Sequence, residues 1–184
     1  MKRPRERDSP FLHLYTAKIK RTSQLRLWRL FQLASWPSVE YNGSMHVEID
    51  NRQDKLKIQP RMLRDFATQF ASLAKVDLGE TTLIIVDDEG CAPINKAAVG
   101  HEGATDVITL FYPAIPGDET GSSAEIIVNA ECALKQRPED PVRELAFYIA
   151  HAFNHLSGRN DDTPEKRTAM HRRERRWLST VLKI

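Results

Sequence analysis

Two histidines and an aspartate in the C-terminal third of the chain have the types and spacing that metal chemistry needs. They lie in the run H-A-F-N-H-L-S-G-R-N-D, in which His151 is followed by His155 four residues later and by Asp161 six residues after that. Histidines four residues apart on a helix share one face, so both imidazoles can reach a single ion. Gly158 lets the chain leave the helix and turn back, which puts Asp161 in place as a third ligand. The pattern predicts a three-ligand divalent-metal site with an open position, as in catalytic zinc sites.

The alternatives to this interpretation are a structural histidine pair and a different ion. A bare H-x-x-x-H motif is a weak signal, because helical histidines often serve only packing and hydrogen bonding. The stop glycine and the third ligand strengthen the metal interpretation. The imidazoles favour zinc, although nickel and other first-row ions also bind such ligands.

The general base of the common zinc peptidases is missing from this motif. Ala152 follows the first histidine, where peptidases of the H-E-x-x-H kind have a glutamate. A peptidase is therefore the weaker hypothesis. Glu144 lies nearly two helical turns before His151 and on the same face. It can orient a ligand histidine, or its negative charge can simply stabilise the N-terminal end of the helix.

Two helices must position these residues. The first is predicted from about Pro141 to Ser157, with Asp140 as its candidate N-cap. The second starts near Pro164, with Asp162 or Thr163 as the cap. Its predicted apolar face consists of Met170, Trp177, Val181 and Ile184. Its other face carries Arg167, Arg172, Arg173, Arg175 and Arg176. Such a run is either a solvated helix face or a contact for RNA.

Upstream of these helices, the hydrophobic pattern predicts several strands and one further helix. Strands are expected at residues 46–50, 82–86, 107–112 and 125–128. A helix that opens at Pro60 is expected to bury Leu63, Phe66, Ala67, Phe70 and Ala74, which recur at helical spacing.

The totals indicate one ordinary globular domain. The chain has 184 residues, of which 41% are hydrophobic and 28% charged, and no window approaches the roughly 18 consecutive apolar residues of a membrane span. The two cysteines, Cys91 and Cys132, are too few for a disulfide framework. We therefore expect no membrane association and a location in the reducing cytoplasm.

The net charge of +2 is unevenly distributed. Residues 1–44 contain nine Lys/Arg and three Asp/Glu, whereas residues 45–184 contain 18 and 22. We expect residues 1–44 to be a basic N-terminal extension, poorly ordered or resulting from a mis-assigned start, and residues 45–184 to be the functional domain. A basic arm can bind nucleic acid through phosphate contacts, or it can be a solvated leader.

Several blocks from Met45 onward resemble the YbeY family of bacterial endoribonucleases. The family signature H-G-x-x-H-L-x-G-Y-D-H is similar to the run that begins at His151, and the preceding E-L-A is present at residues 144–146. The run I-N-K-A-A-V-G-H-E-G-A-T-D-V-I-T-L at residues 94–110 resembles the family block L-N-x-x-Y-R-G-x-x-x-P-T-D-V-L-S-F. The strand at residues 124–128 resembles the family's G-D-I-V-I, and M-H-V-E-I-D-N-R-Q resembles a family N-terminus, which suggests Met45 as the start.

The resemblance implies an α+β fold, in which a small mixed sheet packs with helices and a zincin-like ligand helix precedes a return turn. It also implies a zinc-dependent endoribonuclease that cleaves single-stranded or ribosomal RNA during ribosome maturation. The implied partners are RNA and the ribosomal subunit.

The departures from the family motifs fall on functional positions. Asp161 stands where the family has a histidine, which lowers the net charge of the site by one. The family arginine that is expected to hold the substrate phosphate falls on Val99. Arg159 replaces a tyrosine and either restores positive charge near the metal or is an ordinary surface arginine. These changes motivate a second hypothesis, a metal-binding module that associates with RNA or the ribosome and cleaves slowly or not at all.

Four residues are candidates for substrate binding under this resemblance. Asn95, Thr105 and Asp106 keep their family identities, and Arg159 is the fourth. Thr105 and Asp106 can equally serve to cap the backbone. The catalytic group itself is expected to be a water on the metal, with Glu144 as a possible supporting carboxylate.

Overall fold

The computed structural model describes residues 45–114 and 121–183. All of these residues fall in one unit of the chain. The predicted N-terminal extension, residues 1–44, lies outside the described residues, as does Ile184 of the predicted apolar helix face. No helix within the described ranges is long and apolar enough to cross a membrane.

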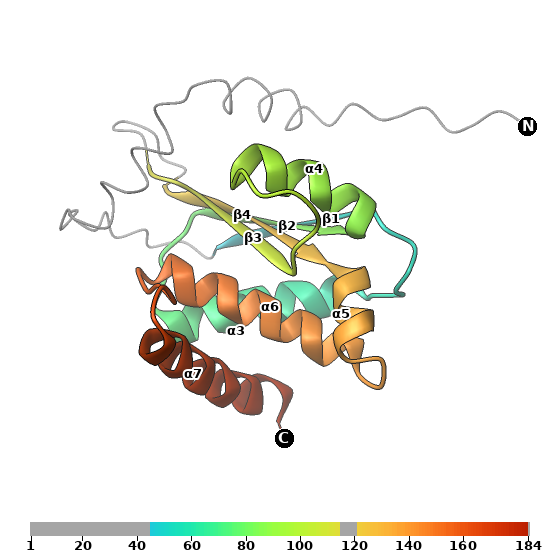
Figure 1. The fold of residues 1–184 in the computed structure, drawn as a ribbon. Coiled ribbons are helices and arrows are strands. Elements are labelled where there is room, and N and C mark those ends of the chain that lie inside the picture. Colours follow the sequence, from blue (N-terminus) through green and yellow to red (C-terminus); the bar gives the residue numbers. More distant parts are fainter. Residues whose placement is uncertain (1–44, 115–120, 184) are drawn as a thin grey trace, which may run out of the picture. The chain divides into compact units, whose positions relative to one another are not determined.

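A four-stranded mixed sheet forms the centre of the unit (Figure 1). Its strands are β1 (His46–Asn51), β2 (Glu80–Val86), β3 (Val107–Tyr112) and β4 (Ser123–Asn129), in the order β1-β2-β4-β3. β1, β2 and β4 are parallel, and β3 pairs antiparallel with β4. All four predicted strands are therefore present, and the mixed sheet with its helices confirms the predicted α+β class.

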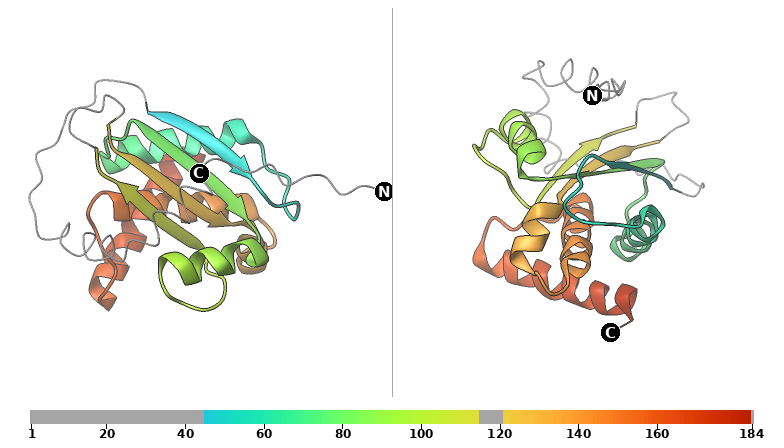
Figure 2. Two further views of the ribbon diagram at one scale, coloured as in Figure 1. Left: turned by 90° about the horizontal axis from the view of Figure 1, so that it is seen from above. Right: turned by 90° about the vertical axis from the view of Figure 1, so that its right-hand side faces the viewer.

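Helices cover both faces of this sheet, which is why its central strands are apolar on both sides (Figure 2). Leu83 and Ile126 belong to the larger core, which packs against α3 (Pro60–Ala74), α5 (Ala130–Gln136) and α6 (Pro141–Leu156). Ile84 and Ile127 point the other way, to the smaller core beneath α4 (Asp88–Ala98). α7 (Pro164–Leu182) packs against α6 and α3, on the side away from the sheet.

The predicted helices are present, and their ends match the sequence signals. Asp140 caps α6 by accepting a hydrogen bond from the Arg143 backbone N–H. Gly158 follows α6 with φ of +83°, a backbone conformation that favours glycine. Thr163, rather than Asp162, caps α7 by accepting from the Lys166 N–H.

Two helices, α4 and α5, were not predicted from the hydrophobic pattern. α4 contains Pro93 in its interior, and α5 has seven residues, which is too short for a helical repeat to be recognised. Both begin directly after a strand, where a carboxylate or an amide caps the helix: Asp87 for α4 and Asn129 for α5.

Candidate metal centre

The two histidines of the motif lie one turn apart on α6, on the flank that remains partly exposed. Most residues between Leu145 and Asn154 are buried against the sheet and the neighbouring helices, whereas His151 and His155 are half-buried. Their rings are 4.5 Å apart between centroids and nearly perpendicular, at 85°. The Nε2 atoms face each other at 3.0 Å.

The outer nitrogen of each ring has a fixed partner. His151 Nδ1 lies 2.8 Å from the Glu174 carboxylate, and His155 Nδ1 lies 3.1 Å from the Arg159 carbonyl oxygen. Both partners are acceptors, so each neutral imidazole carries its proton on Nδ1 and leaves the lone pair on Nε2. Two lone pairs then converge at one point, which is the arrangement that a cation between them stabilises.

Asp161 lies close to this point. One carboxylate oxygen of Asp161 and one nitrogen from each of His151 and His155 all lie within 4.8 Å of one another. Arg167 donates from Nη2 to the Asp161 backbone carbonyl oxygen at 3.2 Å, which ties the return turn to α7. The structure therefore brings the three predicted ligands together, and the donor set suits zinc or a similar divalent ion.

The two ring pKa values shift in opposite directions. Burial by itself lowers the pKa of His151, but the hydrogen bond and the negative charge of Glu174 outweigh it and raise that pKa. Burial and the neighbouring His151 lower the pKa of His155. His155 therefore stays neutral and able to bind an ion to lower pH than His151 does.

Glu174 is the supporting residue that the sequence analysis missed. Its side chain is fully buried, at 0% exposure. Its Oε1 lies 2.8 Å from His151 Nδ1 and accepts a hydrogen bond from Asn154 Nδ2, also at 2.8 Å. A signal was available: Glu174 lies at helical spacing between Met170 and Trp177, on the predicted apolar face of α7. A carboxylate in the middle of an apolar face is unusual unless it has a buried partner.

His171, on α7, is a second residue that the sequence analysis did not identify. One nitrogen of His171 lies within 4.8 Å of a ligand atom of His151 and of one of Glu174. Its ring centroid is 6.2 Å from that of His151 and 5.7 Å from that of Phe147, and the His171 and Phe147 rings are steeply inclined to each other, at 65°. His171 thus borders the site on the side of α7.

Two of the other predicted site residues form hydrogen bonds within the protein, away from the histidine pair. Glu144 accepts from Arg137 Nε at 3.0 Å, so the carboxylate at His151 is that of Glu174. Asn95 is buried and donates to the Gly103 carbonyl oxygen at 2.9 Å. These two side chains therefore stabilise local structure.

The three remaining candidates differ in their surroundings. Thr105 Oγ1 donates to Asp106 Oδ1, which also accepts from the Val107 N–H and so fixes the start of β3. Asp106 is nevertheless near enough for its charge to raise the pKa of His151. Arg159 is exposed in the turn between His155 and Asp161, and its Nη1 donates to Ser157 Oγ at 3.1 Å.

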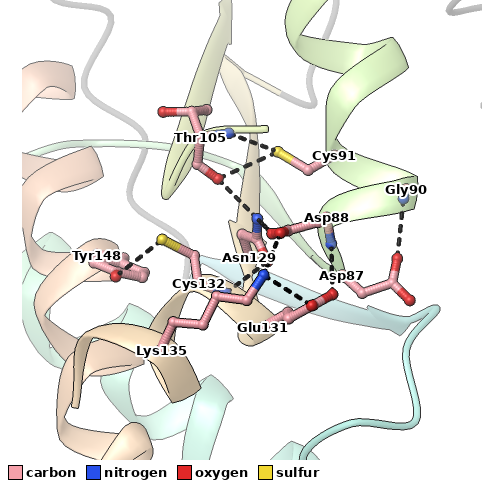
Figure 3. A network of polar contacts seen from close by, with 10 residues as sticks. All are labelled: Asp87, Asp88, Gly90, Cys91, Thr105, Asn129, Glu131, Cys132, Lys135 and Tyr148. Atoms are coloured by element: carbon pink, nitrogen blue, oxygen red, sulfur yellow. Dashed lines mark hydrogen bonds and ion pairs between the residues drawn. The ribbon is translucent and has the colours of Figure 1, made fainter. Parts of the chain in front are cut away.

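A second polar cluster lies where the parallel strands β2 and β4 end (Figure 3). Asn129 Nδ2 donates to Asp88 Oδ1 at 2.8 Å and to the Thr105 carbonyl oxygen at 3.0 Å, and Asn129 Oδ1 accepts from the Cys132 N–H at 3.0 Å. Lys135 Nζ lies 2.6 Å from Asp88 Oδ2, and its hydrogen bond together with that of Asn129 lowers the pKa of Asp88. The polar atoms of this cluster join the end of β4 and the segment before β3 to α4 and α5. We call it the strand-end cluster and define it by Asp88, Thr105, Asn129, Cys132 and Lys135.

Comparison with known proteins identifies the family. The model of the family Endoribonuclease YbeY matches residues 48–182. The chain belongs to the YbeY endoribonuclease family. Endoribonuclease YbeY of Syntrophus aciditrophicus is 30% identical over 141 residues, which cover 71% of this chain and 86% of that protein.

Two further YbeY relatives match over different lengths. The protein of Clostridioides difficile is 29% identical over 150 residues, 74% of this chain and 97% of its own. The protein of Rhodopirellula baltica is 34% identical over 116 residues, and the match spans 61% of this chain and 59% of that relative. The resemblance that the motifs indicated is therefore confirmed at the level of the family.

The position of the missing YbeY arginine is open to solvent. Val99 ends α4 and is 50% exposed, so an apolar side chain occupies a surface position there. The neighbouring Lys96 pairs with Glu102 at 2.8 Å, so its charge is partly neutralised. This part of the surface therefore lacks the arginine charge of the family motif.

Proposed function

We propose that this YbeY family member is a metal-dependent endoribonuclease that hydrolyses single-stranded RNA and acts in ribosomal RNA processing. The observation that carries the proposal is the convergence of three ligand-type side chains, His151, His155 and Asp161, in a chain of this family. The ribosomal subunit is the proposed partner, because precursor RNA is presented there.

The proposed ligands of the ion are the Nε2 atoms of His151 and His155 and a carboxylate oxygen of Asp161. Zinc is the proposed ion, because two imidazoles and one carboxylate form a known catalytic zinc set. When bound, zinc supplies a Lewis acid that polarises a phosphodiester oxygen and lowers the pKa of a water.

The surrounding residues have separate proposed roles. Glu174 holds the proton of His151 on Nδ1 and keeps the ring in its orientation. Arg159 is the proposed phosphate contact nearest the ligands, because it is exposed in the turn that joins them. Thr105 and Asp106 hold the start of β3 beside the site.

The test compares RNA cleavage by the zinc-loaded protein with and without a chelator. We expect the chain to cleave a single-stranded oligoribonucleotide, to stop when the chelator is added, and to be inactive as His151→Ala. Asp88→Asn is the matched control, because it alters the strand-end cluster and should keep cleaving. Bound zinc without cleavage, across several divalent metals, would contradict the proposal and leave a metal-binding RNA-associated module.

We also propose that residues 45–184 form the functional domain and that residues 1–44 are dispensable for metal binding. The family match at residues 48–182 supports this division. A fragment of residues 45–184 should fold and bind one zinc ion per chain. An insoluble or zinc-free fragment would show that the division is wrong.

A cytoplasmic location is part of the same proposal. Cys91 and Cys132 are both free thiols, which suits a reducing compartment. Fractionation of cells that express the tagged protein should place it with the cytoplasmic ribosomes.

A further inference from the structure

The solvent face of α7 is basic, and the helix starts beside the third metal ligand. The segment Pro164–Leu182 contains six Lys/Arg and two glutamates. Glu174 is buried, so Glu165 at the first turn is the acidic residue left at the surface of this helix. Residues 45–184 as a whole have more acidic than basic residues, so positive charge is concentrated on α7.

The charges in the middle of α7 are not neutralised by neighbours. Arg172, Arg175 and Arg176 are exposed, and none of them has an ion pair within the described part of the chain. Arg173 packs over the Trp177 ring at 5.8 Å, and its pKa is lowered by burial and by the charges of Arg159 and Arg176. Like charges held together in this way bind an external anion favourably.

The basic residues of α7 form a row along the helix that begins beside the proposed metal ligands and extends away from them. Arg167, His171 and Arg175 are four residues apart and so lie along one side of the helix. Arg167 contacts the backbone of Asp161, and His171 lies beside His151. Arg175 is one turn further on, and Arg172 lies next to it on the solvent face.

We propose that this face of α7 binds the phosphate backbone of the RNA strand whose scissile bond lies at the metal centre. We call it the α7 basic face and define it by Arg167, His171, Arg172, Arg175 and Arg176. The inference rests on the proposed function, because the strand is the substrate of that site. Guanidinium groups donate paired hydrogen bonds that match phosphate oxygens. The α7 basic face thus provides the positive charge that is absent at Val99.

From the residue types of the α7 basic face we expect RNA binding without base-sequence preference. The α7 basic face contains arginines and one histidine, and Trp177, the aromatic residue of this helix that could stack on bases, is buried. Contacts to phosphates position a strand but carry no base information. Affinity should therefore depend strongly on salt and weakly on base composition.

The experiment reverses two charges that are remote from the ligands. Arg172→Glu/Arg175→Glu is compared with the wild type in the full-length, zinc-loaded protein, and zinc content and melting temperature are checked for each. The matched control is Lys55→Glu/Lys57→Glu, which makes the same charge change at exposed residues of the β1–α3 connection. That connection lies at the opposite end of α6 from the α6–α7 turn (Figure 1). The neutral variant Arg172→Gln/Arg175→Gln is included in case the reversed charges disturb α7.

The measurement is the anisotropy of a fluorescent 20-nucleotide oligouridine at several salt concentrations, with the RNA checked on a gel for integrity. Loss of two phosphate contacts should reduce the slope of log affinity against log salt by about 1.4. At 0.1 M salt this corresponds to an affinity loss of about 25-fold, and the control should lose much less. Wild-type affinity in both α7 variants, or an equal loss in the lysine control, would overturn the proposal.

Two further outcomes separate this inference from the proposed function. If the wild type binds RNA through α7 but never cleaves it, the α7 basic face stands and the proposed activity fails. If the α7 variants bind RNA and cleave it as the wild type does, the activity stands and the α7 basic face fails.

Oligoglutamate is the second ligand tested, as a probe for an acidic protein partner. An affinity for oligoglutamate that depends on the α7 arginines and exceeds the affinity for RNA would identify an acidic protein as the partner and overturn the inference.

Discussion

The metal centre and the strand-end cluster contain similar residue types but use them differently. In the strand-end cluster, Asn129 and Asp88 direct their polar atoms at donors and acceptors of the protein itself (Figure 3). At the metal centre, the two Nε2 atoms face each other although neither carries a proton in the neutral tautomers. Glu174 Oε2 and Asn154 Oδ1, both buried there, accept no hydrogen bond from the described residues.

This difference separates a stabilising polar cluster from one prepared for a ligand. Buried polar groups in folded proteins are almost always paired, so a group of unpaired acceptors indicates that a cation or a proton completes it. The strand-end cluster is already complete, and its loss should affect stability. The proposed metal centre has unpaired acceptors, and its loss should affect metal binding.

The largest expected effect is the loss of a proposed metal ligand. His155→Ala removes one of the two converging lone pairs, and zinc affinity should fall by more than about 100-fold, beyond the loss typical of a supporting residue. Competition with a fluorescent zinc chelator measures it. Zinc binding at wild-type strength would show that His155 is a packing residue.

The next effect concerns the carboxylate that supports His151. Glu174→Gln keeps the size of the side chain but removes the charge that holds the Nδ1 proton, so zinc affinity should fall by about 10- to 100-fold. The same competition assay applies. Glu144→Gln is the matched control, because Glu144 bonds to Arg137 instead and the variant should bind zinc normally.

A third prediction concerns pH. Zinc competes with a proton for His151, whose pKa is raised above its ordinary value of 6.5. Zinc affinity should therefore be constant above the raised pKa and should fall about tenfold per pH unit below it. Without the Glu174 charge, burial lowers the pKa of His151, and in Glu174→Gln the decline should begin at lower pH. Identical profiles for the two proteins would contradict this account of the pKa.

The smallest effect is expected in the strand-end cluster. Asp88→Asn weakens the contact with Lys135 and should lower the free energy of unfolding at pH 7 by about 1 kcal/mol or less, because the pair is partly exposed and screened. The pKa of Asp88 is lower in the folded state than in the unfolded state. The stability that the ionised carboxylate contributes is therefore fully present above the pKa of the unfolded state, and it is lost as pH falls through the pKa of the folded state. Urea unfolding should therefore show the difference between the two proteins closing as pH falls below the ordinary Asp pKa of 3.8, whereas zinc affinity at pH 7 should equal that of the wild type.

The sequence pattern predicts the helices and strands correctly where the signal is local. The periodic segments at 60–74 and 141–156 and the four apolar strands appear in the structure, because helical and strand periods are set by neighbours along the chain. The pattern does not indicate α4, where Pro93 and polar residues obscure the period, or α5, which is only seven residues long. These helices exist because each follows a strand and packs onto the sheet that the strand belongs to.

The proposed metal centre likewise has a part that is set by local sequence and a part that is set by tertiary packing. The spacing of His151 and His155 on one helix follows from 3.6 residues per turn and is present in the sequence itself. The carboxylate of Glu174, by contrast, comes from 23 residues along the chain, and only the packing of α7 against α6 brings it to His151. That contact sets the tautomer of the ring and turns Nε2 toward His155. A helix can present two imidazoles, but a second helix must orient them, because a side chain's proton position depends on its partner in space.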